Sequence, residues 1–271
     1  MAIFSGKNGF LSMVKKISIW LLVVILFVFF DFFMAYAHFG VIKPDNDFVA
    51  APSQPQLHFM VAFMHPFEQE FMDMARPKRF GVVLGEQVTD LTERLKPVKN
   101  NSGIGYWIID YKFQRPGLYW FFMEPEPYWE AAENIFIQHF TKVAVSAYGM
   151  ELGWERPIGL PLEIIPSVRP IGLWTGNAFC GQVLFHGLPV QKGVVEVEYF
   201  NEKQNIKAPY AAYITQTLLT DENGRFCYSM PKAGWWGFAA LVERENELEH
   251  NGKRVGLELG GVIWLQVRDM K

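Results

Sequence analysis

The chain has 271 residues and a formal net charge of −3, from 25 Lys+Arg and 28 Asp+Glu. Hydrophobic residues make up 50% of it and aromatic residues 16%, which excludes a disordered chain and favours strands over helices. The mildly acidic balance excludes a protein that holds nucleic acid on a basic surface. Two cysteines are too few for a cysteine-only zinc site or an iron–sulfur cluster.

Residues 1–37 have the three parts of a secretory signal peptide. Lys15 and Lys16 precede an uncharged apolar run over 17–30, and the segment ends with Ala35-Tyr36-Ala37. The run is shorter than the ~20 residues that span a bilayer. If the segment is counted on through Asp31 to Ala37, it is long enough to span a bilayer, so an uncleaved N-terminal anchor is the alternative.

Either outcome places the remaining chain outside the cytoplasm, in the periplasm or an equivalent extracytoplasmic space. It touches the membrane only if residues 1–37 stay attached. Met13 is a second candidate start, because Lys15 and Lys16 follow it directly. Cleavage after Ala37 makes His38 the first residue of the mature chain.

Strand patterns dominate residues 38–165. The predicted strands cover 56–65, 80–84, 106–113 and 118–123, and 134–148 forms one bent strand or two. A helical turn is expected only within 67–74, between two prolines. This region therefore predicts an immunoglobulin-like antiparallel β-sandwich of roughly seven strands.

Four prolines within 157–170 predict a stiff extended connection, so the domain boundary is placed near 165. The second half, 166–271, returns to strands at 181–185, 194–199, 225–230 and 235–242, and 250–253 is a hairpin turn. Gly181-Gln182-Val183, Pro189-Val190 and the segment Thr220 to Phe226 resemble transthyretin-like or carboxypeptidase-regulatory-like sandwiches. The predicted fold class is all-β, with two immunoglobulin-like antiparallel sandwiches in tandem after an N-terminal signal or anchor helix.

Enzyme signatures are absent from the sequence. It contains no Gly-x-Ser-x-Gly, no phosphate-binding Gly-x-x-x-x-Gly-Lys, no Gly-x-Gly-x-x-Gly and no His-Glu-x-x-His. The chain is therefore expected not to be an enzyme.

Three histidines are candidate metal ligands. As a mature N-terminus, His38 offers its α-amine and its ring to one metal, and nitrogen ligands of this kind suit Ni, Cu, Co or Zn. His65 ends the core-facing row of its strand, whereas His58 lies on the opposite face. His139 shares a strand face with Ile137. Taken singly, His65 and His139 are better explained as hydrogen-bonded rim and core residues than as ligands.

An acidic loop follows the strand at 118–123. Glu124, Glu126 and Glu130 surround Tyr128 and Trp129, and prolines stiffen the loop. The alternative to a binding site is a solvated acidic loop with packed aromatics.

Several longer motifs occur together in residues 37–268. They are Ala37-His38-Phe39-Gly40, the strand end at 64–68, the segment 116–130, Phe136 to Lys142, and Ala233 to Ala240. In this combination the chain resembles a bacterial family of secreted proteins described as the periplasmic component of nickel or cobalt uptake, auxiliary to energy-coupling-factor transporters. The long leader with Asp31 departs from that family.

The resemblance implies a protein that binds Ni²⁺ or Co²⁺ and passes it to a membrane permease. It supplies no ligand set. His38, His65 and His139 are nominated because they fall on the shared motifs and offer nitrogen ligands. Further ligands, or partners of the ligands, are expected among the nearby carboxylates Glu68, Glu124, Glu126 and Glu130.

Two other functions fit the sequence. A carbohydrate- or protein-binding module would use Trp107, Tyr128 and Trp129 as exposed stacking surfaces and would need no metal. A copper protein with a terminal histidine would use the same His38, because Cu²⁺ exceeds Ni²⁺ in affinity at almost any such site.

A disulfide is predicted between Cys180 and Cys227. Export places both cysteines in an oxidising compartment, and both fall on strands of the same half of the chain. Two separately buried thiols are the alternative.

Overall fold

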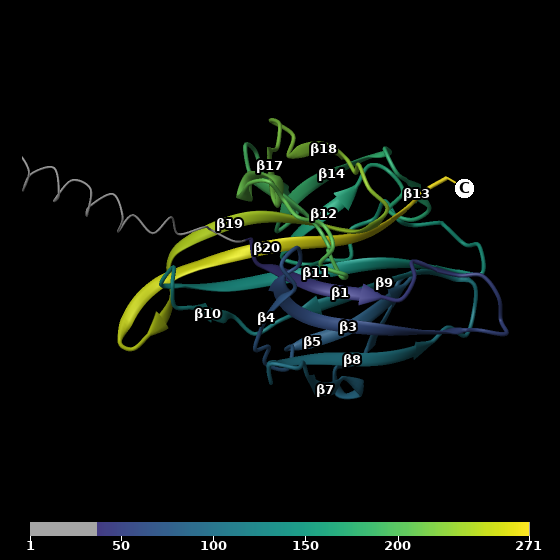
Figure 1. Cartoon of the computed structure of the whole chain (residues 1–271), viewed down its shortest axis with the longest axis horizontal. Coiled ribbons are helices and arrows are strands. Elements are labelled where there is room, and N and C mark those ends of the chain that lie inside the picture. Colours follow the sequence, from purple (N-terminus) through teal and green to yellow (C-terminus); the bar gives the residue numbers. More distant parts are fainter. Residues whose placement is uncertain (1–36, 271) are drawn as a thin grey trace, which may run out of the picture. The chain divides into compact units, whose positions relative to one another are not determined.

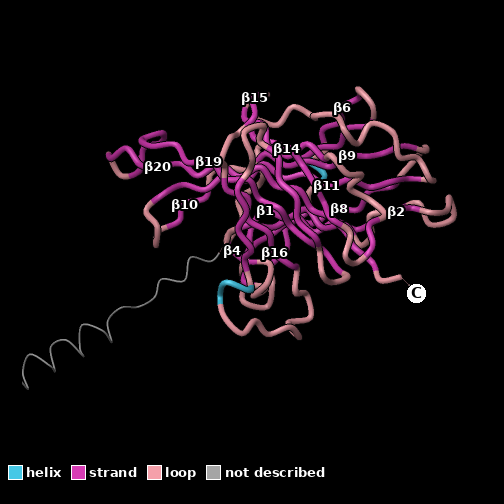
Figure 2. The backbone as a smooth tube through the Cα atoms, turned by 90° about the horizontal axis from the view of Figure 1, so that it is seen from above, coloured by secondary structure: helices cyan, strands magenta, loops and turns pink. Residues whose placement is uncertain are grey.

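The computed structural model describes residues 37–270 (Figure 1). The expected leader, apart from Ala37, lies outside these residues. Within them, no helix is both long enough and apolar enough to cross a membrane. Strands and loops make up almost all of this region (Figure 2), and its helical pieces are two short 3-10 turns, η1 (Thr92–Arg94) and η2 (Ala211–Tyr213).

The first of three sheets is built from the N-terminal half. Its order is β1 (Phe39–Pro44), β3 (Gln56–His65), β8 (Gly105–Lys112) and β7 (Lys96–Lys99), and β4 (Glu70–Met72) also pairs with β3. All of these pairings are antiparallel.

The second sheet has eleven strands and draws on both halves of the chain. Its order is β17 (Thr215–Leu219), β16 (Val194–Tyr199), β19 (Gly234–His250), β20 (Lys253–Arg268), β11 (Ile135–Ala147), β9 (Gly117–Glu124), β5 (Arg79–Leu84) and β6 (Gln87–Asp90). Three short strands join it: β10 (Tyr128–Glu130) and β2 (Phe48–Val49) beside β11, and β13 (Leu173–Trp174) beside β20.

The third sheet belongs to the C-terminal half. It contains β12 (Leu162–Pro166), β14 (Ala178–Phe185), β15 (Leu188–Pro189) and β18 (Arg225–Ser229). Cys180 on β14 lies directly opposite Cys227 on β18, and the two form the disulfide that the sequence predicts, with Cα atoms 4.1 Å apart.

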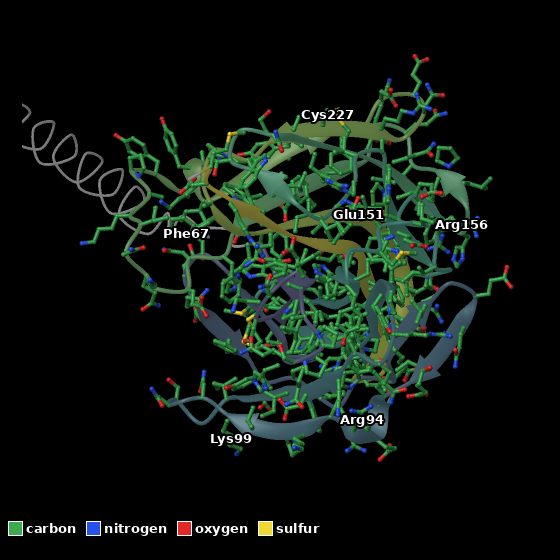
Figure 3. The ribbon with its side chains drawn as sticks, turned by 90° about the vertical axis from the view of Figure 1, so that its right-hand side faces the viewer. Phe67, Arg94, Lys99, Glu151, Arg156 and Cys227 are labelled. Carbon is green, nitrogen blue, oxygen red and sulfur yellow. A yellow bond between two sulfur atoms is a disulfide. The ribbon has the colours of Figure 1, made fainter. Side chains whose placement is uncertain are left out.

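Two hydrophobic cores lie on opposite faces of the eleven-stranded sheet. Successive side chains of a strand point to opposite faces, and β9 shows this clearly. Tyr119 and Phe121 belong to the core shared with the first sheet, whereas Trp120 and Phe122 belong to the core shared with the third. The sheets are therefore three layers. Figure 3 shows Arg94 and Cys227 at opposite sides of the molecule, next to the first and third sheets.

The all-β class with packed sandwich layers is confirmed, but the two halves are joined more closely than a tandem arrangement predicts. β20 pairs in parallel with β11 from Ile135↔Gly256 to Val143↔Trp264. β19 and β20 have 17 and 16 residues, well beyond the usual 3–10, so they reach past their own sandwich. The two sandwiches consequently share their middle sheet.

Two local expectations differ from the structure. Residues 67–74 contain strand β4 rather than a helical turn, because this segment folds back onto the end of β3. The proline-rich stretch near 165 contains strand β12, which pairs with β14 through Pro166 opposite Gly181. Pro166 lies on β12, an edge strand of the third sheet, where a residue without an N–H is tolerated.

Candidate metal centre

His38 and His65 meet at one end of the first sheet. β1 and β3 pair antiparallel with Phe39 opposite Met64, and the next pair outward is His38 and His65. Their ring centroids are 4.6 Å apart. Phe67, two residues beyond His65, marks this end of β3 in Figure 3.

His139 enters the same region from β11 in the middle sheet. The ring of Phe63 neighbours two of the histidines, with its centroid 5.7 Å from that of His38 and 5.7 Å from that of His139. The two sheets thus bring His65 and His139 close enough to His38 for both to affect it electrostatically.

His139 is held tightly. Its side chain is 1% exposed, and its Nδ1 accepts a hydrogen bond from the Gly40 N–H at 3.4 Å. The proton therefore belongs on Nε2, which lies 3.3 Å from Glu258 Oε1 and donates to it. A Cβ atom on Gly260 would lie 2.3 Å from His139 Cδ2, so only glycine leaves room for the ring there.

Each histidine has a carboxylate close to it. His38 Nε2 lies 3.2 Å from Glu130 Oε2, and His139 contacts Glu258. Burial raises the pKa of Glu68, and the nearby His65 opposes this rise in part. Both carboxylate oxygens of Glu68 are buried, and no hydrogen-bond donor within residues 37–270 reaches them.

Glu258 was not among the expected site residues. It lies on β20 opposite Ile137 of β11, two residues along from the point where His139 faces Gly260. The signal that could have identified it is a carboxylate between Leu257 and Leu259, both of which are buried. A charged residue at such a position needs a partner.

Two of the expected carboxylates are engaged elsewhere. Glu124 pairs with Arg79 at 2.9 Å, and Glu126 pairs with Lys78 at 3.2 Å. The acidic loop therefore divides: Glu130 turns to His38, while Glu124 and Glu126 form exposed ion pairs.

The His38 ring is neutral over most of the pH range. Burial, helped by the neighbouring His65 and His139, lowers the pKa of His38 from 6.5 to about 4. A neutral imidazole has the lone pair that a metal requires.

The histidine nitrogens are engaged within the protein. His65 Nδ1 contacts the carbonyl oxygen of Ala37 at 3.0 Å, while His38 and His139 contact Glu130 and Glu258. Over residues 37–270, accordingly, no three His, Cys, Asp or Glu side chains already form a group that could hold a metal ion.

The other histidines lie in different surroundings. His58 is half exposed and contacts Asp110 at 3.1 Å, in keeping with its place on the opposite face of β3. His186 occupies a turn with φ of 47°. His250, at the tip of the β19–β20 hairpin, stacks on Trp129 with ring centroids 3.8 Å apart. Trp129 directly precedes Glu130 in the chain.

The three aromatics considered for stacking on sugars do not form a shared platform. Trp107 donates its indole N–H to the carbonyls of Met74 and Ala75, and Arg76 covers its ring. Trp129 is covered by His250, and Tyr128 packs on Phe63. A cavity of about 140 Å³ beside His139 is lined by Phe63, Met123, Tyr128 and Trp129, among others.

Comparison with solved structures finds several strand-rich proteins at low similarity. Trypsin-activated alpha-2-macroglobulin from Escherichia coli is 11% identical, with a TM-score of 0.23, over 84% of this chain and 16% of that one. Dimeric latent PorU from Porphyromonas gingivalis is 10% identical, with a TM-score of 0.23, over 83% of this chain and 20% of that one. This chain thus spans at most a fifth of the length of either protein.

A putative carbohydrate binding protein from Bacteroides uniformis is 11% identical, with a TM-score of 0.23, over 72% of this chain and 90% of that one. TM-scores this low assign no function. No curated protein matches the chain. The family model described as "Domain of unknown function (DUF4198)" matches residues 35–244, well over half of the sequence. The chain belongs to the DUF4198 family.

Proposed function

We propose that this protein binds Ni²⁺ or Co²⁺ outside the cytoplasm and presents the ion to a membrane permease. The observation that supports binding most strongly is the proximity of His65 and His139 to His38 at one end of the first sandwich. Imidazole nitrogens suit these borderline metals. The permease as partner follows from the sequence resemblance, and the protein itself performs no covalent chemistry in this proposal.

The missing ligand in this proposal is the α-amine of His38. In the chain that retains Ala37, the carbonyl of that residue contacts His65 Nδ1 at 3.0 Å. The His38 nitrogen is bonded to the same carbonyl carbon, so it lies within about 5 Å of His65 Nδ1. Cleavage after Ala37 would remove the carbonyl and turn the amide nitrogen into an amine beside His65.

The carboxylates complete the proposed centre. Glu130 and Glu258 orient the rings of His38 and His139, as carboxylate partners of metal-bound histidines commonly do. In this proposal His139 Nδ1 exchanges its 3.4 Å contact with the Gly40 N–H for the ion. Glu68, whose oxygens are buried without a donor within residues 37–270, becomes a further ligand or a partner of the bound ion.

Calorimetric titration of the chain starting at His38 tests this function. We expect one Ni²⁺ or Co²⁺ per chain, and we expect His65→Ala or His139→Ala to weaken binding at least 100-fold. His58→Ala is the matched control, because His58 lies on the same strand but contacts exposed Asp110. Equal affinity in all four proteins would contradict the proposal.

A further inference from the structure

A second cavity lies at the other end of the first sandwich. Its volume is about 420 Å³, within the range of small-molecule sites, compared with about 140 Å³ for the cavity beside His139. It opens between the edge strand β6 of the middle sheet and strand β8 of the first sheet. Its lining residues are Val82, Leu84, Gln87, Thr89, Leu91, Arg94, Tyr111, Lys112, Gln114, Arg115 and Tyr119.

This cavity carries uncompensated positive charge. Arg94, Lys112 and Arg115 line it, and no Asp or Glu is among its lining residues. None of the three cations forms an ion pair with any residue of the described part of the chain. The cavity would attract anions.

Both arginines are held in place by neutral groups. Arg94 donates to the backbone oxygen of Asp110 at 3.0 Å, and its guanidinium lies over the Tyr111 ring, 5.7 Å from the centroid. Arg115 donates to Gln87 Oε1 at 3.0 Å, and its own carbonyl accepts a hydrogen bond from the Tyr119 hydroxyl. These contacts orient the guanidinium groups but leave their charge and most of their donors for a ligand.

The base of the cavity favours an organic ligand over a bare inorganic ion. Val82 and Leu91 are each 2% exposed, and Leu84 lies beside them, so the base is apolar while the wall is cationic. We propose that this cavity binds a small organic anion that carries two or more carboxylate or phosphate groups. Guanidinium groups recognise either kind of group through paired hydrogen bonds.

The anion site is separate from the histidine cluster. Lys112 pairs with Gln56 at the start of β3, whereas His65 ends the same strand. At 3.3 Å per residue the two positions are roughly 30 Å apart. Anion binding and metal binding can therefore succeed or fail independently.

Calorimetric titration of the full chain in a neutral detergent tests the proposal, with citrate and 2-phosphoglycerate as probes and acetate as the singly charged comparison. We expect the doubly or triply charged probes to bind and to weaken as salt rises. The double variant Arg94→Gln/Arg115→Gln should lose at least tenfold in affinity, and Arg94→Lys/Arg115→Lys should recover part of that loss. Thermal unfolding shows that each variant is folded.

The matched control is Arg156→Gln/Arg225→Gln, which removes the same charge from exposed positions elsewhere; Figure 3 shows Arg156 at the surface, away from Arg94. This control should bind the anions like the unaltered chain. Two results would overturn the proposal: no binding of either probe at millimolar concentration, or an equal loss of affinity in both double variants.

Discussion

His38 and His65 face each other just beyond the last pair of the β1–β3 ladder, with ring centroids 4.6 Å apart and ring planes inclined at 48°. Their proximity follows from backbone pairing, because Phe39 opposite Met64 leaves them as the next pair outward. The indole N–H of Trp264 also donates to the Gly40 carbonyl at 2.8 Å, which fixes the start of β1. A chain that begins at His38 would therefore have its terminus held beside His65.

Glu258→Gln should weaken metal binding by about 10–100-fold, because it removes the charge that orients the His139 ring while keeping the side-chain size. Calorimetry with Ni²⁺ measures this change in the dissociation constant. Glu249→Gln is the control, since Glu249 is exposed on β19. Unchanged affinity in Glu258→Gln would show that Glu258 does not support the site.

Glu198 should make the protein less stable as the pH rises. Burial raises its pKa from 4.5 to about 8, and nearby Glu68 and Glu196 add to this effect, while hydrogen bonds from Thr215 and Phe67 oppose it. The folded state therefore binds a proton that the unfolded state has lost between pH 4.5 and 8. The stabilisation is complete below pH 4.5 and is lost as the pH approaches 8.

Urea unfolding at pH 5 and pH 8 measures this contribution, which is of the order of 4 kcal/mol for a shift of this size. Glu198→Gln should show a smaller difference between the two pH values than the unaltered protein. The difference should persist in Glu222→Gln, which changes an exposed glutamate. An identical pH dependence in all three proteins would mean that Glu198 titrates normally.

Loss of the Cys180–Cys227 disulfide should lower the free energy of unfolding by roughly 4 kcal/mol, because the bond closes a loop of 47 residues in the unfolded chain. Urea unfolding of the double variant Cys180→Ala/Cys227→Ala measures the loss. The unaltered protein, unfolded under reducing conditions, should show a similar loss. A change below about 1 kcal/mol in both would contradict the prediction.

Strands with a clear local pattern could be predicted from the sequence. Residues 56–65 and 194–199 alternate or run apolar between turn residues, and they form β3 and β16 with those limits. The parallel pairing of β11 with β20 could not be predicted, because it joins segments more than a hundred residues apart and depends on no local signal. The shared middle sheet was missed for the same reason.

The candidate site, too, could be predicted from the sequence only in part. The position of His65 at the rim followed from strand alternation, and His38 followed from the expected cleavage point. The partners of Glu124 and Glu126 were not predictable, because their ion pairs with Arg79 and Lys78 depend on the pairing of β5 with β9. Glu258 was missed because its strand was not predicted.

The most direct test of the central claim is the effect of one extra alanine before His38. It leaves every side chain in place but moves the α-amine away from His65 and out of the chelate with the His38 ring. Calorimetric titration with Ni²⁺, at a pH near 8 where the amine loses its proton readily, compares this chain with the one that begins at His38. The account predicts that the dissociation constant of the extended chain is at least 100-fold larger, and equal dissociation constants would contradict it.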